Sequence, residues 1–283
     1  PYHMNDSDSI KEVMEGTSVC VNMIGKYYET RHAVPVRANE KGTKSFVNST
    51  FEEIHIDAPV KLAKIAKEMG IKRMIHVSAL GADKESPSSW LRTKALGEEA
   101  VKAEFPDVVI VRPGPLFGPE DRLLNNFAMN ADRLPFVPLI EGGKALIQPT
   151  YVSDVADAIT ALLEDTEGEY NGKIFELAGN ADFTWEELMQ FTYDVTYQKP
   201  RVLPVSKEIA LVMGEALGLL PKPIFTKDEI LLNLSDRVLD ADKPGLLHYE
   251  DLDITPTKIE DVAFRYLHRF RAGGHFITYE GYH

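Results

Sequence analysis

Apolar runs alternate with segments of helical periodicity over much of the chain, and this alternation limits the possible folds most strongly. The runs are rich in β-formers and span residues 18–24, 72–78 and 108–112. Between them, residues 51–69 and 88–104 carry apolar side chains at helical spacing. Strands that alternate with helices favour a parallel sheet, because each crossover packs back onto that sheet. We therefore predict an α/β fold with a doubly wound, Rossmann-like parallel sheet.

Further elements continue this pattern toward both ends of the chain. Residues 6–15 predict a short helix, and residues 173–178 predict another strand. Residues 148–158 are expected to form a strand that runs into a helix capped by Ser153 or Asp154.

The last third of the chain has a different character. Thr184 and Glu187 have the spacing of a capping box, which predicts the start of a helix. Residues 206–220 are apolar with few charges, whereas residues 265–271 are basic and aromatic. A helix packed on the main domain and a solvated helix end are the simplest interpretations. Contact with lipid or a partner is the alternative for both stretches.

Charge and composition argue against several functions. The chain has 44 acidic and 31 basic residues, and its formal net charge of −13 disfavours nucleic-acid binding, which needs a basic surface. The eight histidines have no metal-ligand spacing, so we predict no metal site. The single cysteine, Cys20, lies in an apolar run and is expected to be a buried structural thiol. We expect no signal or transit segment, and no stretch reaches the roughly 18 apolar residues of a membrane span.

The stretch from Met74 to Lys94 carries the features of a ligand-binding edge. Ser78 ends a predicted buried strand, and ligands of open α/β sheets bind at the carboxyl ends of the strands. Trp90 and Lys94 lie four residues apart on one face of the next predicted helix. The plain alternative is that Ser78 and Lys94 are only polar residues at the ends of elements.

A strand-end serine followed by an aromatic-x-x-x-lysine helix resembles the short-chain dehydrogenase/reductase superfamily. In that superfamily a tyrosine four residues before the lysine transfers a proton, and the serine polarises the substrate carbonyl. Here Trp90 occupies the tyrosine position. An indole N–H donates a hydrogen bond but does not release a proton near neutral pH. A positioned acid–base group contributes about 10²–10⁴ in rate, so the substitution implies that the chain is not an enzyme.

Two turns are similar to the cofactor-binding turns of the same superfamily. Asn22-Met23-Ile24-Gly25 ends the first predicted strand, and a Pro- and Gly-rich segment from Arg112 to Pro119 follows a later one. In the superfamily these turns lie on the nicotinamide side of the cofactor. An ordinary turn at Gly25 and a proline-stiffened loop after Arg112 are the alternatives.

The glycine-rich loop of such folds, Gly-x-x-Gly-x-x-Gly after a strand, has no match in the sequence. The run at residues 18–24 corresponds instead to the fourth strand of the superfamily pattern. We therefore expect the first β-α-β-α-β half of the nucleotide-binding domain to be absent. On this basis residues 1–180 form a partial dinucleotide-binding domain, and residues 181–283 form a small α-rich C-terminal subdomain.

Taken together, the motifs resemble one atypical branch of the superfamily: the nucleotide-binding accessory subunits of mitochondrial respiratory complex I, the NADH:ubiquinone oxidoreductase, often called its 39 kDa type. The resemblance extends over nearly the whole chain. The matching stretches are Asp8 to Ile10, Val21 to Gly25, Tyr28 to Thr30, His76 to Ser78, Leu91 to Ala95, Gly97-Glu98, Phe117 to Arg122, Tyr151 to Ala156, Phe183-Thr184 and Asp251 to Asp253.

The resemblance implies a non-catalytic subunit on the matrix side of the mitochondrial inner membrane. It would hold NADPH as a structural cofactor, contact other complex I subunits and support assembly, with peripheral lipid contact through residues 206–220 and 265–271 as a further option. The implied nicotinamide-side contacts are Ile24, Gly25, Val77, Ser78, Lys94, Pro113, Gly114, Pro115 and Leu116.

Two other functions stay open at this point. An active NADP-dependent reductase or epimerase of the extended family would use Ser78 and Lys94 with a relocated acid such as Tyr27 or Tyr28. A nucleotide-sensing regulator would bind the cofactor together with a soluble partner.

Overall fold

A computed structural model describes residues 6–29, 49–220, 223, 225–239 and 243–271 of the chain. Thr30, which ends one of the family matches, and the outermost residues of both expected domains lie outside these ranges.

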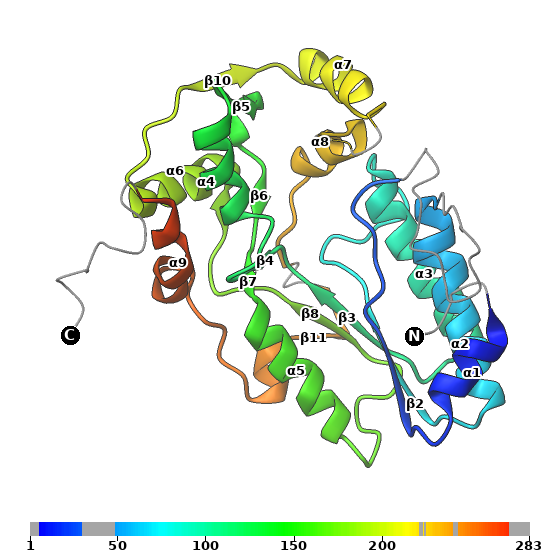
Figure 1. The fold of residues 1–283 in the computed structure, drawn as a ribbon. Coiled ribbons are helices and arrows are strands. Elements are labelled where there is room, and N and C mark those ends of the chain that lie inside the picture. Colours follow the sequence, from blue (N-terminus) through cyan, green and yellow to red (C-terminus); the bar gives the residue numbers. More distant parts are fainter. Residues whose placement is uncertain (1–5, 30–48, 221–222, 224, 240–242, 272–283) are drawn as a thin grey trace.

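A five-stranded parallel sheet forms the centre of the fold (Figure 1). All of its strand pairs are parallel; for example, His76 lies beside Ile110, and Phe175 lies beside Leu247. The predicted doubly wound α/β architecture is confirmed. In spatial order the strands are β1 (Val19–Asn22), β2 (Arg73–Val77), β3 (Val109–Pro113), β8 (Ile174–Leu177) and β11 (Leu246–Leu247).

Helices cover both faces of this sheet, so its strands are apolar on both sides. Ile110 belongs to the core under one face and Val111 to the core under the other, because successive side chains of a strand point in opposite directions. Both residues are fully buried. Three helices pack on the first face and one on the second: α1 (Ser7–Met14), α2 (Ala58–Glu68) and α3 (Ser89–Glu104), opposite α5 (Val152–Glu164).

The helix expected over residues 51–69 contains a π-helical turn, η1 (Glu53–Asp57), directly before α2. Pro59 has no N–H to donate to the carbonyl of His55 four residues earlier, which explains the wider turn at this point. Gly97 of α3 packs on that carbonyl, and a Cβ added at Gly97 would lie 2.0 Å from the oxygen. The glycine therefore lets α3 approach η1 closely.

An outer region lies beyond the carboxyl edge of the sheet. Its helices α4, α6 and α9 bury a shared apolar cluster, and α7 packs against α8. The elements are β4 (Leu116–Phe117), α4 (Leu124–Arg133), β5 (Val137–Ile140), η2 (Glu141–Gly143), β6 (Leu146–Ile147), β7 (Thr150–Tyr151), β9 (Phe183–Thr184), α6 (Trp185–Thr196), β10 (Val202–Val205), α7 (Lys207–Leu217), α8 (Lys227–Asn233), α9 (Ile259–Leu267) and η4 (His268–Phe270). A further short helix, η3 (Tyr249–Leu252), packs on the central sheet instead.

Elements from both sides of residue 180 contribute to both regions. β11 completes the central sheet, and Tyr249 of η3 is buried against its second face. In the outer region α4 packs against α6, and β5 pairs with β10. The two-domain division at residue 180 stays a prediction, and the chain crosses between the two regions more than once.

The helix cap expected at Ser153 or Asp154 is wrong. Neither residue caps α5; the Asp154 carboxylate instead accepts hydrogen bonds from the backbone N–H and the hydroxyl of Thr257, at 2.6 and 2.9 Å. Ser88 is the N-cap residue of α3, but its side chain makes no capping bond. The capping box of α6 at Thr184 is confirmed.

The basic and aromatic stretch 265–271 is largely held by the protein itself. The Tyr266 hydroxyl donates to the Asp121 carboxylate at 2.7 Å, and Arg269 donates to the side chain of Asn125 at 2.8 Å. Arg271 is buried and donates to the carbonyl of Val195. Lipid contact through this stretch therefore stays a prediction, and packing accounts for most of its side chains.

Three further expectations concern Cys20, membrane-spanning helices and metal ligands. Cys20 is buried as expected, and burial raises the pKa of its thiol. None of the helices within the described ranges combines the length and apolarity that crossing a bilayer requires. The same ranges contain no group of three His, Cys, Asp or Glu side chains placed to hold a metal ion.

Candidate functional site

The carboxyl ends of β2 and β3 meet at one edge of the sheet and carry most of the predicted site residues. The Ser78 N–H donates to the carbonyl of Val111 at 2.7 Å, and the Leu80 N–H donates to the carbonyl of Pro113 at 2.9 Å. These bonds keep the two chain segments side by side beyond the strands. Six of the nine predicted contacts line one cavity at this edge: Val77, Ser78, Pro113, Gly114, Pro115 and Leu116.

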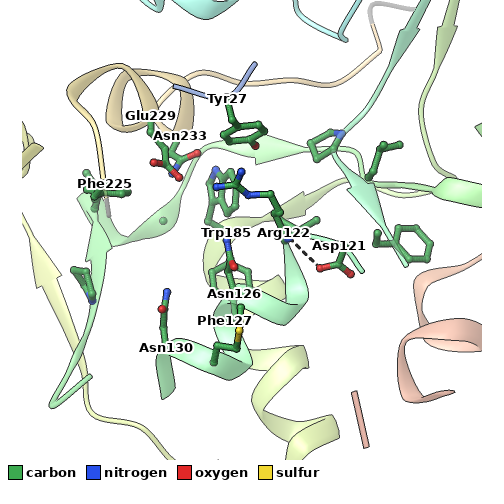
Figure 2. Close-up of a pocket in the computed structure, with 18 of the residues that line it drawn as sticks. Tyr27, Asp121, Arg122, Asn126, Phe127, Asn130, Trp185, Phe225, Glu229 and Asn233 are labelled. Atoms are coloured by element: carbon green, nitrogen blue, oxygen red, sulfur yellow. Dashed lines mark hydrogen bonds between the residues drawn. The ribbon is translucent and has the colours of Figure 1, made fainter. Parts of the chain in front are cut away.

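The cavity has a volume of about 1130 Å³ and extends from the sheet edge to α4, α7 and α8. Figure 2 shows Asn126 and Asn130 on α4, with Glu229 and Asn233 on α8 across from them. Nothing in the local sequence of these helices predicted a shared cavity, because its walls come from segments far apart in the chain.

Lys94 lies behind the sheet edge rather than in the cavity wall. Its side chain is buried, and Nζ donates to the carbonyl of Val77 at 3.3 Å. A Cβ added at Gly25 would lie 3.4 Å from the same Nζ, so the ammonium packs on this glycine. Burial lowers the pKa of Lys94 to about 8, against an opposing contribution from the Glu98 carboxylate. Lys94 thus contacts the turn after β1 and the end of β2.

The turn after β1 is held by Asn22. The Ile24 N–H donates to the Asn22 side-chain oxygen at 3.1 Å, and the Asn22 amide nitrogen lies 2.9 Å from His76 Nδ1. Ile24 packs against the core of the first sheet face instead of lining the cavity. The predicted contact at Ile24 can therefore come only from its backbone or its exposed side.

Two buried polar atoms at this edge have no hydrogen-bond partner within the described residues, Ser78 Oγ and His76 Nε2. Leaving such a group unsatisfied costs about 1–3 kcal/mol. Burial and, to a smaller extent, the nearby Lys94 ammonium lower the pKa of His76 to about 3, so the imidazole is neutral at physiological pH. Ser78 lines the cavity, so a bound polar group is the natural partner for its hydroxyl.

The indole N–H of Trp90 donates a hydrogen bond to the backbone. Nε1 donates to the carbonyl of Lys26 at 2.7 Å, and the ring lies 5.8 Å from Lys94 Nζ. The position where the superfamily pattern places a proton-transferring hydroxyl therefore carries a fixed structural hydrogen bond. Tyr27 lines the cavity, with the Arg122 guanidinium 4.7 Å from its ring centre, whereas Tyr28 is not part of the cavity lining.

The turn after β3 is shaped by its glycine and by its arginine. A Cβ added at Gly114 would lie 2.2 Å from the carbonyl oxygen of Gln148, so only glycine fits. The Arg112 side chain makes ion pairs with Glu98 of α3 at 2.6 Å and Glu176 of β8 at 3.0 Å. It fixes α3 against the sheet and leaves the backbone of residues 113–116 to face the cavity.

Asp228, a residue that the sequence pattern did not single out, caps α3. Its carboxylate accepts hydrogen bonds from the Ser88 hydroxyl at 3.0 Å, the Trp90 N–H at 3.1 Å and the Ser89 N–H. A carboxylate at a helix N-terminus also interacts favourably with the helix dipole. The cap comes from α8, 138 positions after Trp90, and has no local sequence signal.

Comparisons with known proteins are consistent with this geometry. A family model described as the RmlD substrate binding domain matches residues 47–212, more than half of the chain. The mitochondrial NADH dehydrogenase (ubiquinone) 1 alpha subcomplex subunit 9 of Arabidopsis thaliana is 38% identical over 283 residues, covering 96% of this chain and 65% of its own length. The Dictyostelium discoideum protein of the same name is 31% identical over 97% of this chain and 71% of its own length.

Among solved structures, a dTDP-glucose 4,6-dehydratase of Streptomyces venezuelae with NAD bound has a TM-score of 0.64. It is 18% identical and covers 94% of this chain and 77% of that chain, which establishes a common fold. The chain spans about two thirds of the length of the subunit 9 proteins.

Proposed function

This chain belongs to the family of NADH dehydrogenase (ubiquinone) 1 alpha subcomplex subunit 9, and we propose that it is a non-catalytic subunit of mitochondrial complex I that holds NADPH as a structural ligand. The observation that carries the non-catalytic part is the hydrogen bond from the Trp90 indole to Lys26. It replaces a titratable hydroxyl with a fixed donor that cannot shuttle protons.

The residues at the sheet edge fit the nicotinamide half of such a cofactor. Ser78 offers an unsatisfied buried hydroxyl, Gly25 leaves room beside the Lys94 ammonium, and Gly114 brings its backbone to the cavity. Ile24, Val77, Pro113, Pro115 and Leu116 complete the proposed set. When bound, the cofactor would supply a redox-active nicotinamide, but a structural ligand transfers no hydride. Its role is to stabilise the fold, by roughly 4 kcal/mol at a thousandfold excess over Kd.

The proposed setting is the matrix side of the mitochondrial inner membrane, in contact with other complex I subunits. The mitochondrial names of the relatives and their membership of the ubiquinone-dependent NADH dehydrogenase support it. Migration of the endogenous protein on a native gel tests this setting. Nearly all of it should run with a large membrane complex, and a dominant free pool would instead favour a nucleotide-sensing regulator.

The cofactor site is tested through Lys94. Lys94→Ala should lower NADPH retention after gel filtration, measured by cofactor fluorescence, and should lower the amount of assembled complex. Lys84→Ala is the matched control, because Lys84 is exposed and forms a surface ion pair with Glu99. Equal NADPH retention in Lys94→Ala and Lys84→Ala would contradict the assignment of the cofactor site to Lys94.

The rival function is an active reductase or epimerase, and Tyr27 keeps it testable because this tyrosine lines the cavity. The purified protein is incubated with NADPH and a panel of carbonyl compounds, and cofactor oxidation is followed by the absorbance of the reduced nicotinamide. We expect no turnover. Turnover that is lost in Tyr27→Phe would establish the enzyme and overturn the non-catalytic proposal.

A further inference from the structure

Arg237 is a buried cation in the wall of the cavity. It is 5% exposed, lines the cavity, and its guanidinium lies 5.7 Å from the centre of the Trp185 ring. Its Nε has no hydrogen-bond partner, and none of the ion pairs formed by the described residues includes it. The guanidinium stays charged because arginine does not lose its proton in proteins.

The backbone holds Arg237 firmly in this place. Its N–H donates to the carbonyl of Leu146 at 2.8 Å, and its carbonyl accepts from the Gln148 N–H at 3.1 Å. The side chain passes over Gly81, where an added Cβ would lie 3.0 Å from Arg237 Cγ. The glycine therefore leaves the space that the arginine stem occupies.

An unpaired charge in such a position is costly, and an anion would remove the cost. Burying an ion without a partner costs several kcal/mol even after relaxation. Two carboxylates of the cavity wall do not pair with Arg237. Asp121 accepts hydrogen bonds from Tyr266 and from backbone N–H groups, and burial raises the pKa of the Glu229 carboxyl, against an opposing contribution from Arg122. Arg237 is thus the buried cation that a ligand can pair with.

The remainder of the cavity is suited to a chain of hydrocarbon. Apolar and aromatic side chains make up most of its walls, and residues at its rim remain apolar where they are exposed: Leu134 is 41% and Phe136 is 36% exposed. α7 is apolar on two sides, with Met213 and Leu217 in the cavity wall and Ile209 and Val212 toward solvent. A helix with apolar residues on both faces fits a boundary between a cavity and a lipid surface.

From this arrangement we propose that the cavity binds a phosphate-bearing amphiphile from a lipid surface, with its phosphate on Arg237 and its hydrocarbon chain between α4 and α7. Arg237 supplies the charge-assisted contact, and the apolar rim provides the entry path for the chain. This site does not depend on the NADPH proposal, because none of the nicotinamide-side contacts is needed for it.

The two tryptophans of the chain, Trp90 and Trp185, both line the cavity, so intrinsic fluorescence reports its occupancy. Delipidated full-length protein is titrated with monomeric dodecyl phosphate, dodecanol and inorganic phosphate, and calorimetry gives the stoichiometry. We expect one dodecyl phosphate per chain, dodecanol binding at least about tenfold weaker, and no binding of inorganic phosphate in the same range, since a charged hydrogen bond contributes about 1.5–3 kcal/mol.

Arg237→Met should weaken dodecyl phosphate at least about tenfold and leave dodecanol unchanged. Arg133→Met is the matched control, because Arg133 also lines the cavity but is exposed. If Arg237→Met loses its near-ultraviolet circular dichroism, Arg237→Lys keeps a cation and takes its place, with an intermediate affinity expected. Co-flotation with vesicles of phosphatidic acid, compared with phosphatidylcholine, identifies the lipid surface as the source.

Three results would overturn the proposal. Equal affinities for dodecyl phosphate and dodecanol would show that the phosphate charge does not contribute to binding. Unaltered binding of dodecyl phosphate by Arg237→Met would show that Arg237 does not contact the phosphate. Saturable binding of UDP-glucose that displaces dodecyl phosphate would assign the cavity to a sugar nucleotide. Loss of NADPH retention in Lys94→Ala leaves all three readouts unaffected, so the two proposals fail separately.

Discussion

Arg112 keeps 14% of its side chain exposed and Arg237 is buried, and the surroundings of the two arginines differ. Arg112, at the centre of the sheet, contacts the carboxylates of Glu98 and Glu176, whereas Arg237, in the cavity wall, contacts no carboxylate of the described ranges. Unsatisfied uncharged groups occur both near the cavity edge, at Ser78 and His76, and away from it, at Tyr193 of α6. The contrast between paired and unpaired polar groups therefore rests on the two arginines.

The largest expected effect comes from breaking the paired arginine. Arg112→Met leaves two carboxylates buried without their partner and should lower the free energy of unfolding by about 3–5 kcal/mol. Urea denaturation at pH 7 measures it. Arg265→Met, at an exposed helix position, should change stability by less than about 0.5 kcal/mol. A loss below about 1 kcal/mol in Arg112→Met would show that the ion pairs contribute little.

Acid titration addresses the neutral histidines near the cavity edge. Burial lowers the pKa of His55 and of His76 from 6.5 to about 3, with the Lys94 ammonium adding to both shifts. Above pH 6.5 neither the folded nor the unfolded chain protonates these rings, so they contribute nothing. Below pH 6.5 the unfolded chain takes up protons first, and stability falls with decreasing pH until about pH 3.

At pH 5 each histidine should cost about 2 kcal/mol relative to pH 7. His76→Gln cannot titrate in this range, so its stability should fall less steeply between pH 7 and pH 5, by about that amount. Denaturant unfolding at several pH values gives the slopes. Identical slopes for the wild-type protein and His76→Gln would mean that His76 titrates normally in the folded state.

The cap of α3 connects the two regions and should have a smaller effect. Asp228→Ala removes three hydrogen bonds to Ser88, Ser89 and Trp90 and should destabilise the fold by about 1–2 kcal/mol. Asp228→Asn retains an acceptor oxygen and should lose less. Thermal unfolding of the two variants measures the difference, and an Asn variant as unstable as the Ala variant would contradict a capping role.

The smallest change is expected at the unpaired arginine. Arg237→Met removes a buried charge that has no carboxylate partner, so without added ligand its stability should stay within about 0.5 kcal/mol of the wild-type value or rise. The same urea titrations used for Arg112→Met provide the comparison. A loss comparable to that of Arg112→Met would show that Arg237 has a structural partner and would erase the contrast between the two arginines.

The sequence predicted the parts of the protein that depend on local pattern. Apolar runs such as residues 108–112 specify strands buried on both faces, and the spacing of Trp90 and Lys94 puts both residues on the part of α3 that packs near the end of β2. Contacts between distant segments could not be predicted in this way. Asp154 bonds Thr257 instead of capping α5, and the choice between these two partners is made by tertiary packing.

The limit of prediction from local sequence is clearer for the cavity. Val77 and Ser78 could be assigned to a ligand edge from one strand alone, but the opposite wall requires α4, α7 and α8 to fold against that edge. Arg237 lies in a stretch of sequence with no recognisable motif. Its proposed role could be inferred only from the structure, where its buried Nε has no hydrogen-bond partner among the described residues.

The last strand of the sheet arrives late in synthesis. β11, at Leu246–Leu247, pairs with β8, and shortly after it the Tyr249 hydroxyl lies 2.6 Å from Thr150 Oγ1. A nascent chain must therefore leave the ribosome as far as Tyr249 before its sheet can close. A polypeptide terminated earlier would present β8 as an open edge, and open edges pair with other chains. Stop codons placed before Tyr249 should therefore give aggregated product rather than a shortened folded protein.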